Sequence, residues 1–369
     1  MRTFIIFLAA AYAAQGQTSI LKHSFENDTE GWIAMGANGS VKVGKEAKSG
    51  SGALQFSYSL DNKAISSLVF PAGVGNLTGM RRIRFWLKTD HDTPIAVVLA
   101  EKKPGGGDYA AMLWASKNVW LRVDLALSDF VASDGPNDPV DSNGKLDTDQ
   151  VEGIGILDFS AVFNQTPAES PMIVEKAVGA HTLLIDDFEI LDSAKAATAK
   201  PGVILIDSFD RGFSEWITFG GISVSLSPND NPIGGPALVA SIRGVDGKLA
   251  LLLRRMNPAE IAGAKRLTFE IAAEHEGTFA ISIETKKPGA TGGQGPRYNF
   301  MVNPPEGRAV FRVNVSLADF EHDENSPDDP AGKLEASRIK LIAIGDITAI
   351  AGGAVANNRI WIGRVEMLK

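Results

Sequence analysis

The feature that most constrains this chain is a long internal repeat. Ser24–Trp32, SFENDTEGW, returns as SFDRGFSEW at Ser208–Trp216, and Val123–Phe130, VDLALSDF, returns as VNVSLADF at Val313–Phe320. Further phrases recur in the same order: Arg82–Asp90 with Arg266–Glu274, Lys102–Gly105 with Lys286–Gly289, Gly144–Asp147 with Gly332–Glu335, and Leu184–Leu191 with Trp361–Leu368. Solenoid repeats have periods of roughly 20 to 50 residues, so this much longer period indicates two copies of a whole domain.

The repeat divides the 369 residues into two domains and a connection. A chain of this length exceeds one ordinary hydrophobic core. We predict a first domain at 17–192, a linker at 193–202 and a second domain at 203–369. The linker sequence, SAKAATAKPG, is small and polar and ends in Pro-Gly, which is typical of a short connection between domains.

The first residues carry the pattern of an export signal. Arg2 precedes an apolar run from Phe4 to Tyr12, and small residues follow. This pattern predicts a signal peptide at 1–16, cleaved near Ala14 to Gly16. The run is shorter than the ~20 apolar residues of a membrane span, and no other stretch comes near that length. We therefore expect a secreted or periplasmic protein without a membrane span.

Charge and residue usage exclude several classes of function. The formal charge is −8, from 36 basic and 44 acidic residues, so binding to nucleic acid is not expected. The absence of cysteine excludes disulfides, thiolate chemistry and cysteine zinc sites. The sequence contains neither a nucleophile elbow nor a phosphate-binding loop. No metal-ligand spacing is found among the five histidines His23, His91, His181, His275 and His322. Carboxylate pairs for glycoside hydrolysis stay open, because only geometry distinguishes them from chance pairs.

Apolar and polar residues alternate along many short segments of both copies. In IRFWLK, residues 83–88, the apolar side chains fall on one side, while Trp86 shares the other side with arginine and lysine. Such alternation is typical of half-buried strands. About ten candidate strands per copy are separated by turn residues, and no amphipathic helix exceeds two turns. We predict an all-β protein of two tandem jelly-roll β-sandwich domains, in which the first and last strands of each copy pair.

Three phrases resemble a known family. They are the acid-bearing SFE…GW opening, WLRVDLALSDF at Trp120–Phe130, and the closing strand IDDFEI at Ile185–Ile190. The chain resembles the galactose-binding-like jelly rolls, in particular carbohydrate-binding module family 11 and the complex I intermediate-associated protein 30 domain. The resemblance covers nearly all the mature chain, once per copy. It implies glycan binding on a concave sheet face or cleft or, by analogy with the second group, a structural role through protein–protein contacts.

Aromatic residues are the first candidates for a sugar contact, because sugar rings stack on flat side chains while neighbouring polar groups pair with their hydroxyls. Trp86 is the leading candidate, since it shares the polar side of its strand with Arg84. A tryptophan covered by a loop or by the other domain is the alternative. Trp114 is a second candidate by parity. Three more tryptophans occupy fold-signature positions and are expected to pack inside: Trp32, Trp120 and Trp216.

Tyrosines and paired polar residues complete the predicted contact set. Tyr109 and Tyr298 follow the glycine-rich loop after KKPG, where the family often places a tyrosine in the ligand cleft, although the leucine beside Tyr109 in its row also fits a core position. A guanidinium beside a carboxylate or amide can pair with neighbouring sugar hydroxyls, and a solvated cross-strand pair is the alternative. Such pairs occur in both copies: Arg122 with Asp124, and Arg312 with Asn314.

The resemblance also implies a structural calcium ion between the first and last strands of a domain. In the first copy Glu26 and Asp187, with Asp186 nearby, would supply the hard oxygen ligands that calcium requires. In the second copy Arg364 occupies the place of Asp187. We therefore expect calcium in the first domain and an ion pair between Asp210 and Arg364 in the second.

Together these observations predict an exported, non-catalytic protein that binds polysaccharide. Glu270 stands in the second copy where the first has Trp86, so we expect the first domain to bind better. We expect a monomer. A structural or assembly role with a protein partner is the main alternative, and a glycan hydrolase or lyase is a third.

Overall fold

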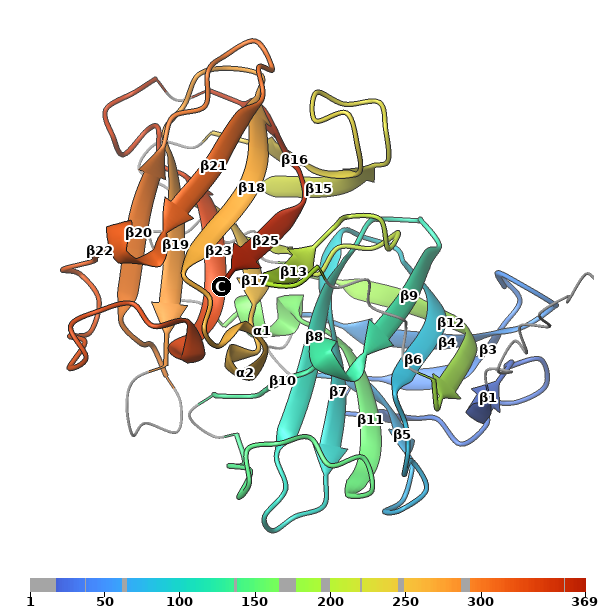
Figure 1. Ribbon diagram of the computed structural model, residues 1–369. Helices are drawn as coiled ribbons and strands as arrows, with labels where there is room; N and C mark the ends of the chain where they lie inside the picture. The colour runs from blue at the N-terminus through green and yellow to red at the C-terminus, as the bar shows by residue number, and fades with distance from the viewer. Residues whose placement is uncertain are drawn as a thin grey trace, which may run out of the picture.

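The computed structural model describes residues 18–36, 38–61, 65–135, 138–165, 177–193, 200–219, 221–244, 249–286, 293–354 and 356–369. The predicted signal peptide and most of the predicted linker, 194–199, lie outside the described residues. Figure 1 shows two lobes of strands that follow one another along the chain. The prediction of an all-β, tandem β-sandwich fold is confirmed. No helix of the described ranges is long and apolar enough to cross a membrane.

The first sandwich consists of two six-stranded sheets. Sheet I has the order β3-β4-β12-β6-β9, with β1 beside β12, and sheet II has the order β10-β8-β7-β11-β5-β2. A four-residue helix, α1 (Ser160–Phe163), follows β11. The strands are β1 (Ser19–His23), β2 (Ile33–Met35), β3 (Ser40–Gly44), β4 (Ala53–Ser59), β5 (Ser67–Pro71), β6 (Arg82–Thr89), β7 (Thr93–Glu101), β8 (Asp108–Ala115), β9 (Leu121–Ala126), β10 (Val131–Ala132), β11 (Val151–Asp158) and β12 (Ala180–Leu191).

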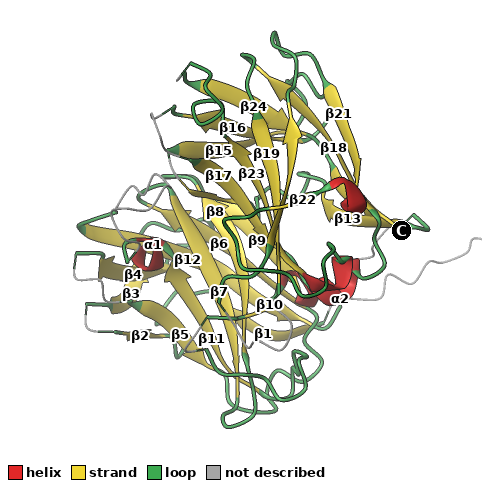
Figure 2. Ribbon diagram, turned by 90° about the vertical axis from the view of Figure 1, so that its left-hand side faces the viewer, coloured by secondary structure: helices red, strands yellow, loops and turns green. Residues whose placement is uncertain are grey.

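The second sandwich repeats this arrangement with one seven-stranded and one six-stranded sheet. Sheet III has the order β13-β25-β18-β24-β16-β15, with β21 beside β18, and sheet IV has the order β14-β17-β23-β19-β20-β22. Its α-helix, α2 (Pro258–Ile261), is again four residues long. Figure 2 shows α1 and α2 in red beside the strands. The strands are β13 (Val203–Asp207), β14 (Ile217–Phe219), β15 (Ile222–Ser227), β16 (Ala237–Ile242), β17 (Ala250–Arg255), β18 (Arg266–Ala273), β19 (Phe279–Thr285), β20 (Arg297–Val302), β21 (Phe311–Ser316), β22 (Glu321–His322), β23 (Ile339–Asp346), β24 (Asn358–Ile362) and β25 (Val365–Leu368).

The ends of each copy pair as predicted. β1 runs antiparallel to β12, with His23 opposite Phe188, and β13 runs antiparallel to β25, with Val203 opposite Leu368. Each sandwich therefore begins and ends in the same sheet. The side chains of the first strand are thereby brought close to those of the last.

The repeated phrase VDLALSDF/VNVSLADF builds the same local structure twice. Its alternating residues form β9 and β21, and the following residues form a short 3-10 turn at Leu127–Asp129 and Leu317–Asp319. In each turn the aspartate carboxylate accepts the backbone N–H three residues earlier, at 2.8 Å in the first copy and 3.3 Å in the second. The closing Phe130 and Phe320 are buried. The phrase thus recurs because it encodes a strand, a turn and a core anchor.

The two sandwiches pack against each other through the outer faces of sheets II and IV. Ala96 and Met112 of sheet II share a buried apolar cluster with Ile217 of sheet IV. Trp114 of β8 packs against the core of the second sandwich, and its backbone N–H donates to the carbonyl of Ser214 at 2.9 Å. These faces are consequently covered where the domains meet.

A segment of the second half of the chain also enters the first sandwich. The Phe213 ring is 2% exposed and belongs to the core of the first domain. The guanidinium of Arg211 lies 4.5 Å from the centroid of that ring. Arg211 donates to the carboxylate of Asp129 at 2.6 Å and to the carbonyl of Asp124 at 2.7 Å. Apolar burial and charged hydrogen bonds therefore fix the domains to one another.

Candidate functional site

The outer face of sheet I carries the leading candidate, Trp86. Its neighbours along β6, Phe85 and Leu87, are fully buried, whereas Trp86 points to the opposite side and is half-buried. Opposite it in the sheet stand Arg122 on β9 and Asp186 on β12. The strand alternation therefore places the ring on the polar face, as the sequence predicts.

Cationic side chains flank the Trp86 ring. The Lys48 ammonium lies 4.5 Å from the ring centroid, and the Arg122 guanidinium lies 5.9 Å from it. Both cations favour the ring face, whose quadrupole is negative. Lys48 and Arg122 are exposed, so they can move aside when another flat group approaches the ring.

An ion-pair network continues from Trp86 across sheet I. Asp124 accepts from Arg82 Nε at 2.9 Å, and Arg84 Nε lies 3.5 Å from the other Asp124 oxygen. Arg84 also lies 3.8 Å from a carboxylate oxygen of Glu189. The structure thus brings Arg84, Trp86, Arg122 and Asp124 together on adjacent strands. Donors and acceptors surround one half-buried ring there.

The second sandwich lacks such a ring at the equivalent place. In the strand register Arg312 of β21 stands opposite Glu270 of β18, as Arg122 of β9 stands opposite Trp86 of β6 in the first copy. Asn314 is exposed, and its side-chain oxygen accepts from Arg266 Nε at 2.8 Å. The tryptophan on this face of sheet III is Trp361, opposite Ala272; it is 5% exposed, and the Arg308 guanidinium lies 5.2 Å from its ring centroid.

Two predicted tyrosines lie in the cores instead. Tyr109 is 4% exposed and donates its hydroxyl to Asp141, while Tyr298 is 3% exposed and donates to Asp329 at 2.5 Å. Burial and the accepting carboxylate raise the pKa of both hydroxyls. This corrects their assignment as ligand residues, because neither presents a ring face to solvent. They fasten two acidic loops to the sandwiches.

The second tryptophan candidate, Trp114, contacts the other domain and is not available to a ligand. Trp114 has the outward parity that the sequence predicts, but its outward side meets the second sandwich. Its assignment as a sugar ligand is therefore corrected to a domain contact. Trp32 and Trp216 are buried, in agreement with a packing role, whereas Trp120 is half-buried.

The residues of the predicted calcium site meet a single loop, 48–51. Glu26 accepts from the backbone N–H and the hydroxyl of Ser51 at 2.8 and 2.7 Å. Asp186 accepts two backbone N–H groups of the loop at 2.7 and 2.9 Å, and Asp187 accepts a serine hydroxyl at 2.7 Å. Burial raises the pKa of Asp186. These carboxylate oxygens are hard ligands of the kind that calcium takes. They already accept hydrogen bonds from the 48–51 loop, so calcium binding here stays a prediction.

The ion pair expected in the second copy is wrong. Arg364 pairs with Glu366, two residues further along β25, and Asp210 is exposed and accepts from the Ser208 hydroxyl at 2.7 Å. Arg364 immediately precedes β25, and its partner is therefore a near neighbour in the chain.

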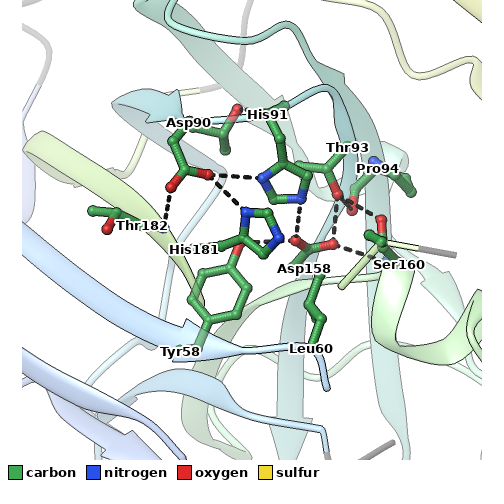
Figure 3. A network of polar contacts seen from close by, with 12 residues as sticks. Tyr58, Leu60, Asp90, His91, Thr93, Pro94, Asp158, Ser160, His181 and Thr182 are labelled. Atoms are coloured by element: carbon green, nitrogen blue, oxygen red, sulfur yellow. Dashed lines mark hydrogen bonds and ion pairs between the residues drawn. The ribbon is translucent and has the colours of Figure 1, made fainter. Parts of the chain in front are cut away.

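One polar cluster, formed by Asp90, His91 and His181, was not predicted from the sequence. Asp90 and His91 lie in the turn between β6 and β7, and His181 lies on β12 (Figure 3). One ring nitrogen of each histidine and one carboxylate oxygen of Asp90 lie within 4.8 Å of one another. Because the two histidines are 90 positions apart, local spacing gives no signal. The dipeptide Asp-His at the end of a strand is the one available hint.

Buried charges between the domains also went unpredicted. Glu215 lies between Arg211 and Arg254, each with a nitrogen 2.7 Å from a carboxylate oxygen. Burial raises the pKa of Glu215 to about 7, against the effect of the nearby arginines. Arg211 and Glu215 are four residues apart, and Arg254 lies on β17, so the fold of the second domain brings the three charges together.

Comparisons with known proteins identify similar structures. No family model and no curated protein matches the chain. The family 11 carbohydrate-binding module of Clostridium thermocellum in complex with a β-1,3-1,4-mixed-linked tetrasaccharide is 14% identical, with a TM-score of 0.37, over 46% of this chain and 97% of that one. The tandem of two family 22 modules from Paenibacillus barcinonensis Xyn10C is 14% identical, with a TM-score of 0.31, over 97% of this chain and 99% of that one. A family 30 carbohydrate-binding module is 13% identical, with a TM-score of 0.30, over 40% of this chain and 77% of that one.

Proposed function

We propose that the chain is an exported, non-catalytic polysaccharide-binding protein that acts as a monomer through the outer face of sheet I. The single observation that carries the proposal is the half-buried Trp86 ring on that face, which is bordered by the ion-pair network of Arg84 and Asp124. The apolar start of the sequence supports export.

The contact would combine stacking with hydroxyl pairing. A sugar ring lies flat on the indole, as C–H faces do on aromatic side chains. The Lys48 ammonium, at 4.5 Å from the ring centroid, moves aside or pairs with a ring hydroxyl. Arg122 and Asp124 supply a donor fork and an acceptor from the neighbouring strand. On the outer face of sheet I, Trp86 would therefore contact the flat face of a sugar ring, while Arg122 and Asp124 would pair with hydroxyls at its edge.

Exposed apolar residues favour a second candidate, assembly with a protein partner. Ile33 and Met35 of β2 are about half exposed at the edge of sheet II. Isolated exposed apolar residues are ordinary, whereas a pair on an edge strand offers a site for a partner chain. The same experiment distinguishes this candidate from glycan binding.

The test compares full-length variants in affinity electrophoresis through gels that contain polysaccharides, including mixed-linked β-glucan and xylan. Loss of a central tryptophan anchor costs about 2 kcal/mol, or ~30-fold in affinity. We expect Trp86→Ala to lose retention and Trp86→Phe to keep part of it. The control Phe311→Ala removes a partly exposed ring from the second domain and should leave retention unchanged.

Three outcomes would contradict the proposal. Retention that Trp86→Ala leaves unchanged would remove the site. Assembly would be favoured if the wild-type protein binds no polysaccharide but binds a partner protein, and if Ile33→Ser loses that protein binding. Turnover of labelled polysaccharide would make the protein an enzyme.

A further inference from the structure

Two imidazoles and a carboxylate converge at one end of the first sandwich. His91 Nδ1 lies 2.9 Å from Asp90 Oδ1, and His181 Nδ1 lies 3.0 Å from the same oxygen. The two rings are neighbours, with centroids 3.8 Å apart. Figure 3 shows both rings turned toward the Asp90 carboxylate. Three potential ligand atoms thus surround one point.

The other ring nitrogens already face acceptors. His91 Nε2 lies 2.9 Å from Asp158 Oδ2, although outside hydrogen-bond geometry, and His181 Nε2 lies 3.0 Å from the carbonyl of Val178. A neutral imidazole carries one N–H, and the Val178 carbonyl favours the proton at Nε2 of His181. The lone pair of His181 Nδ1 then faces the Asp90 carboxylate, and a cation between them would satisfy both groups. His91 Nδ1 and Asp90 share a hydrogen bond whose proton such a cation can displace.

The surroundings of the cluster supply negative charge and few positive groups. Asp90 and Asp158 contribute two carboxylates, and the ion pairs that they form among the described residues are with histidines. A divalent cation would supply positive charge at the point where the three ligand atoms meet.

We propose that the Nδ1 atoms of His91 and His181 and the carboxylate of Asp90 form a binding site for a divalent transition cation of the Zn²⁺ class. Imidazole nitrogen and carboxylate oxygen suit this class of ion. Tetrahedral ligands about 2.0 to 2.1 Å from zinc lie about 3.3 Å apart. The present separations of 2.9 and 3.0 Å therefore need to open by only a few tenths of an ångström.

The site has a fixed base and an open entrance. Asp158, at the base, accepts from Tyr58 at 2.7 Å and from the Ser160 N–H at 2.9 Å, and these bonds hold it beside His91. Carboxylates that orient a ligating histidine in this way are common around zinc. The side chains of His91 and His181 are 16% and 15% exposed, so an ion can reach them from solvent. Three protein ligands leave one position of a tetrahedral ion for water.

The second sandwich provides an internal comparison. Glu274 and His275 repeat the acid–histidine pair at the end of β18, but Asn358 stands where the first copy has His181. Asn358 bonds to the backbone of His275, accepting its N–H at 3.1 Å and donating to its carbonyl at 3.0 Å. The His275 ring is exposed. One site per chain is therefore expected, in the first domain alone.

Calorimetric titration of the full-length, metal-stripped protein with ZnCl₂ tests the proposal, and Co²⁺ absorption spectra report the ligand field. We expect one equivalent to bind, with proton release and with an affinity that falls as the pH is lowered. His181→Asn copies the residue of the second domain and should weaken binding more than 100-fold. Asp158→Asn should weaken it by about 10- to 100-fold, as expected for a residue that orients a ligand. His275→Asn, the control, should change nothing.

Urea unfolding of each variant shows whether it folds, and imidazole NMR of the wild type gives a readout without mutation. Zinc-dependent shifts confined to His91 and His181 support the site. Three results would overturn it: no zinc binding by the folded wild type, equal affinity in folded His181→Asn, or imidazole spectra showing both rings doubly protonated at neutral pH and unaltered by zinc.

Discussion

Replacing Phe213 by Ala probes whether the two sandwiches behave as one unit. The ring belongs to the second half of the chain, yet it is 2% exposed within the core of the first sandwich. Truncation of a buried phenylalanine removes its transfer free energy and leaves a cavity, at a cost of about 3–5 kcal/mol. The variant also loses the contact of Arg211 with the ring, about 0.5–2 kcal/mol. We expect the free energy of unfolding to fall by about 4 kcal/mol.

Urea unfolding followed by tryptophan fluorescence and by far-UV circular dichroism measures this change. In the wild type we expect the two probes to report coincident transitions, because the interface couples the domains. In Phe213→Ala we expect the transitions to separate. The control Phe311→Ala alters a 37% exposed ring on β21 and should change stability by less than about 0.5 kcal/mol. A loss below 1 kcal/mol in Phe213→Ala, with coincident probes, would refute the docking of this ring.

The same contact decides how the functional tests are designed. A protein cut between the domains leaves the Phe213 site of the first sandwich empty and exposes Ala96 and Met112 of sheet II. Changes in binding by an isolated half then mix ligand effects with loss of folding. Point variants of the full chain avoid this ambiguity.

The remaining predictions concern pH and calcium. Burial raises the pKa of Glu215 from an ordinary 4.5 to about 7. The folded state therefore holds the Glu215 proton more tightly than the unfolded state does. As the pH rises from 4.5 to about 7, the contribution of Glu215 to the free energy of unfolding declines. In Glu215→Gln the free energy of unfolding, measured in urea, should vary less with pH between 4.5 and about 7. A slope equal to that of the wild type would show that other groups cause the pH dependence. Calorimetric titration of the full chain with CaCl₂ should show one site that Glu26→Gln abolishes; no heat in the wild type, or equal heat in the variant, would contradict the calcium prediction.

Most of the fold was predictable because it is encoded locally and then repeated. Alternating side chains identify strands wherever one face is buried, as in residues 83–88. The pairing of the first and last strands follows from their apolar character and from the order of the phrases. Strand parity also placed Trp86 on the polar side of sheet I, since a one-residue slip would turn Phe85 and Leu87 out to solvent.

The errors at the candidate site share one physical origin. Parity says which side of a sheet a residue takes, but it does not say what covers that side. Trp114 points outward as predicted and is then covered by the second sandwich. Tyr109 and Tyr298 were assigned by resemblance, and the loops that bury them form only in the folded chain. The cluster of Asp90, His91 and His181 was missed because it joins a turn and a strand that are far apart in the sequence.

The domain contact determines how many binding faces the tandem can offer. Each sandwich has two outer sheet faces, and packing uses one from each, since Met112 of sheet II meets Ile217 of sheet IV. Sheets I and III remain, but Glu270 stands on sheet III where sheet I has Trp86. Avidity requires two sites that engage one polymer together. Sheet III has a tryptophan of its own, Trp361 opposite Ala272, but it is 5% exposed and the Arg308 guanidinium lies 5.2 Å from its ring centroid. Because Trp361 is nearly covered, duplication here does not double the proposed contact. The second copy acts on the first through Phe213 and Arg211, which hold the sandwich that carries Trp86.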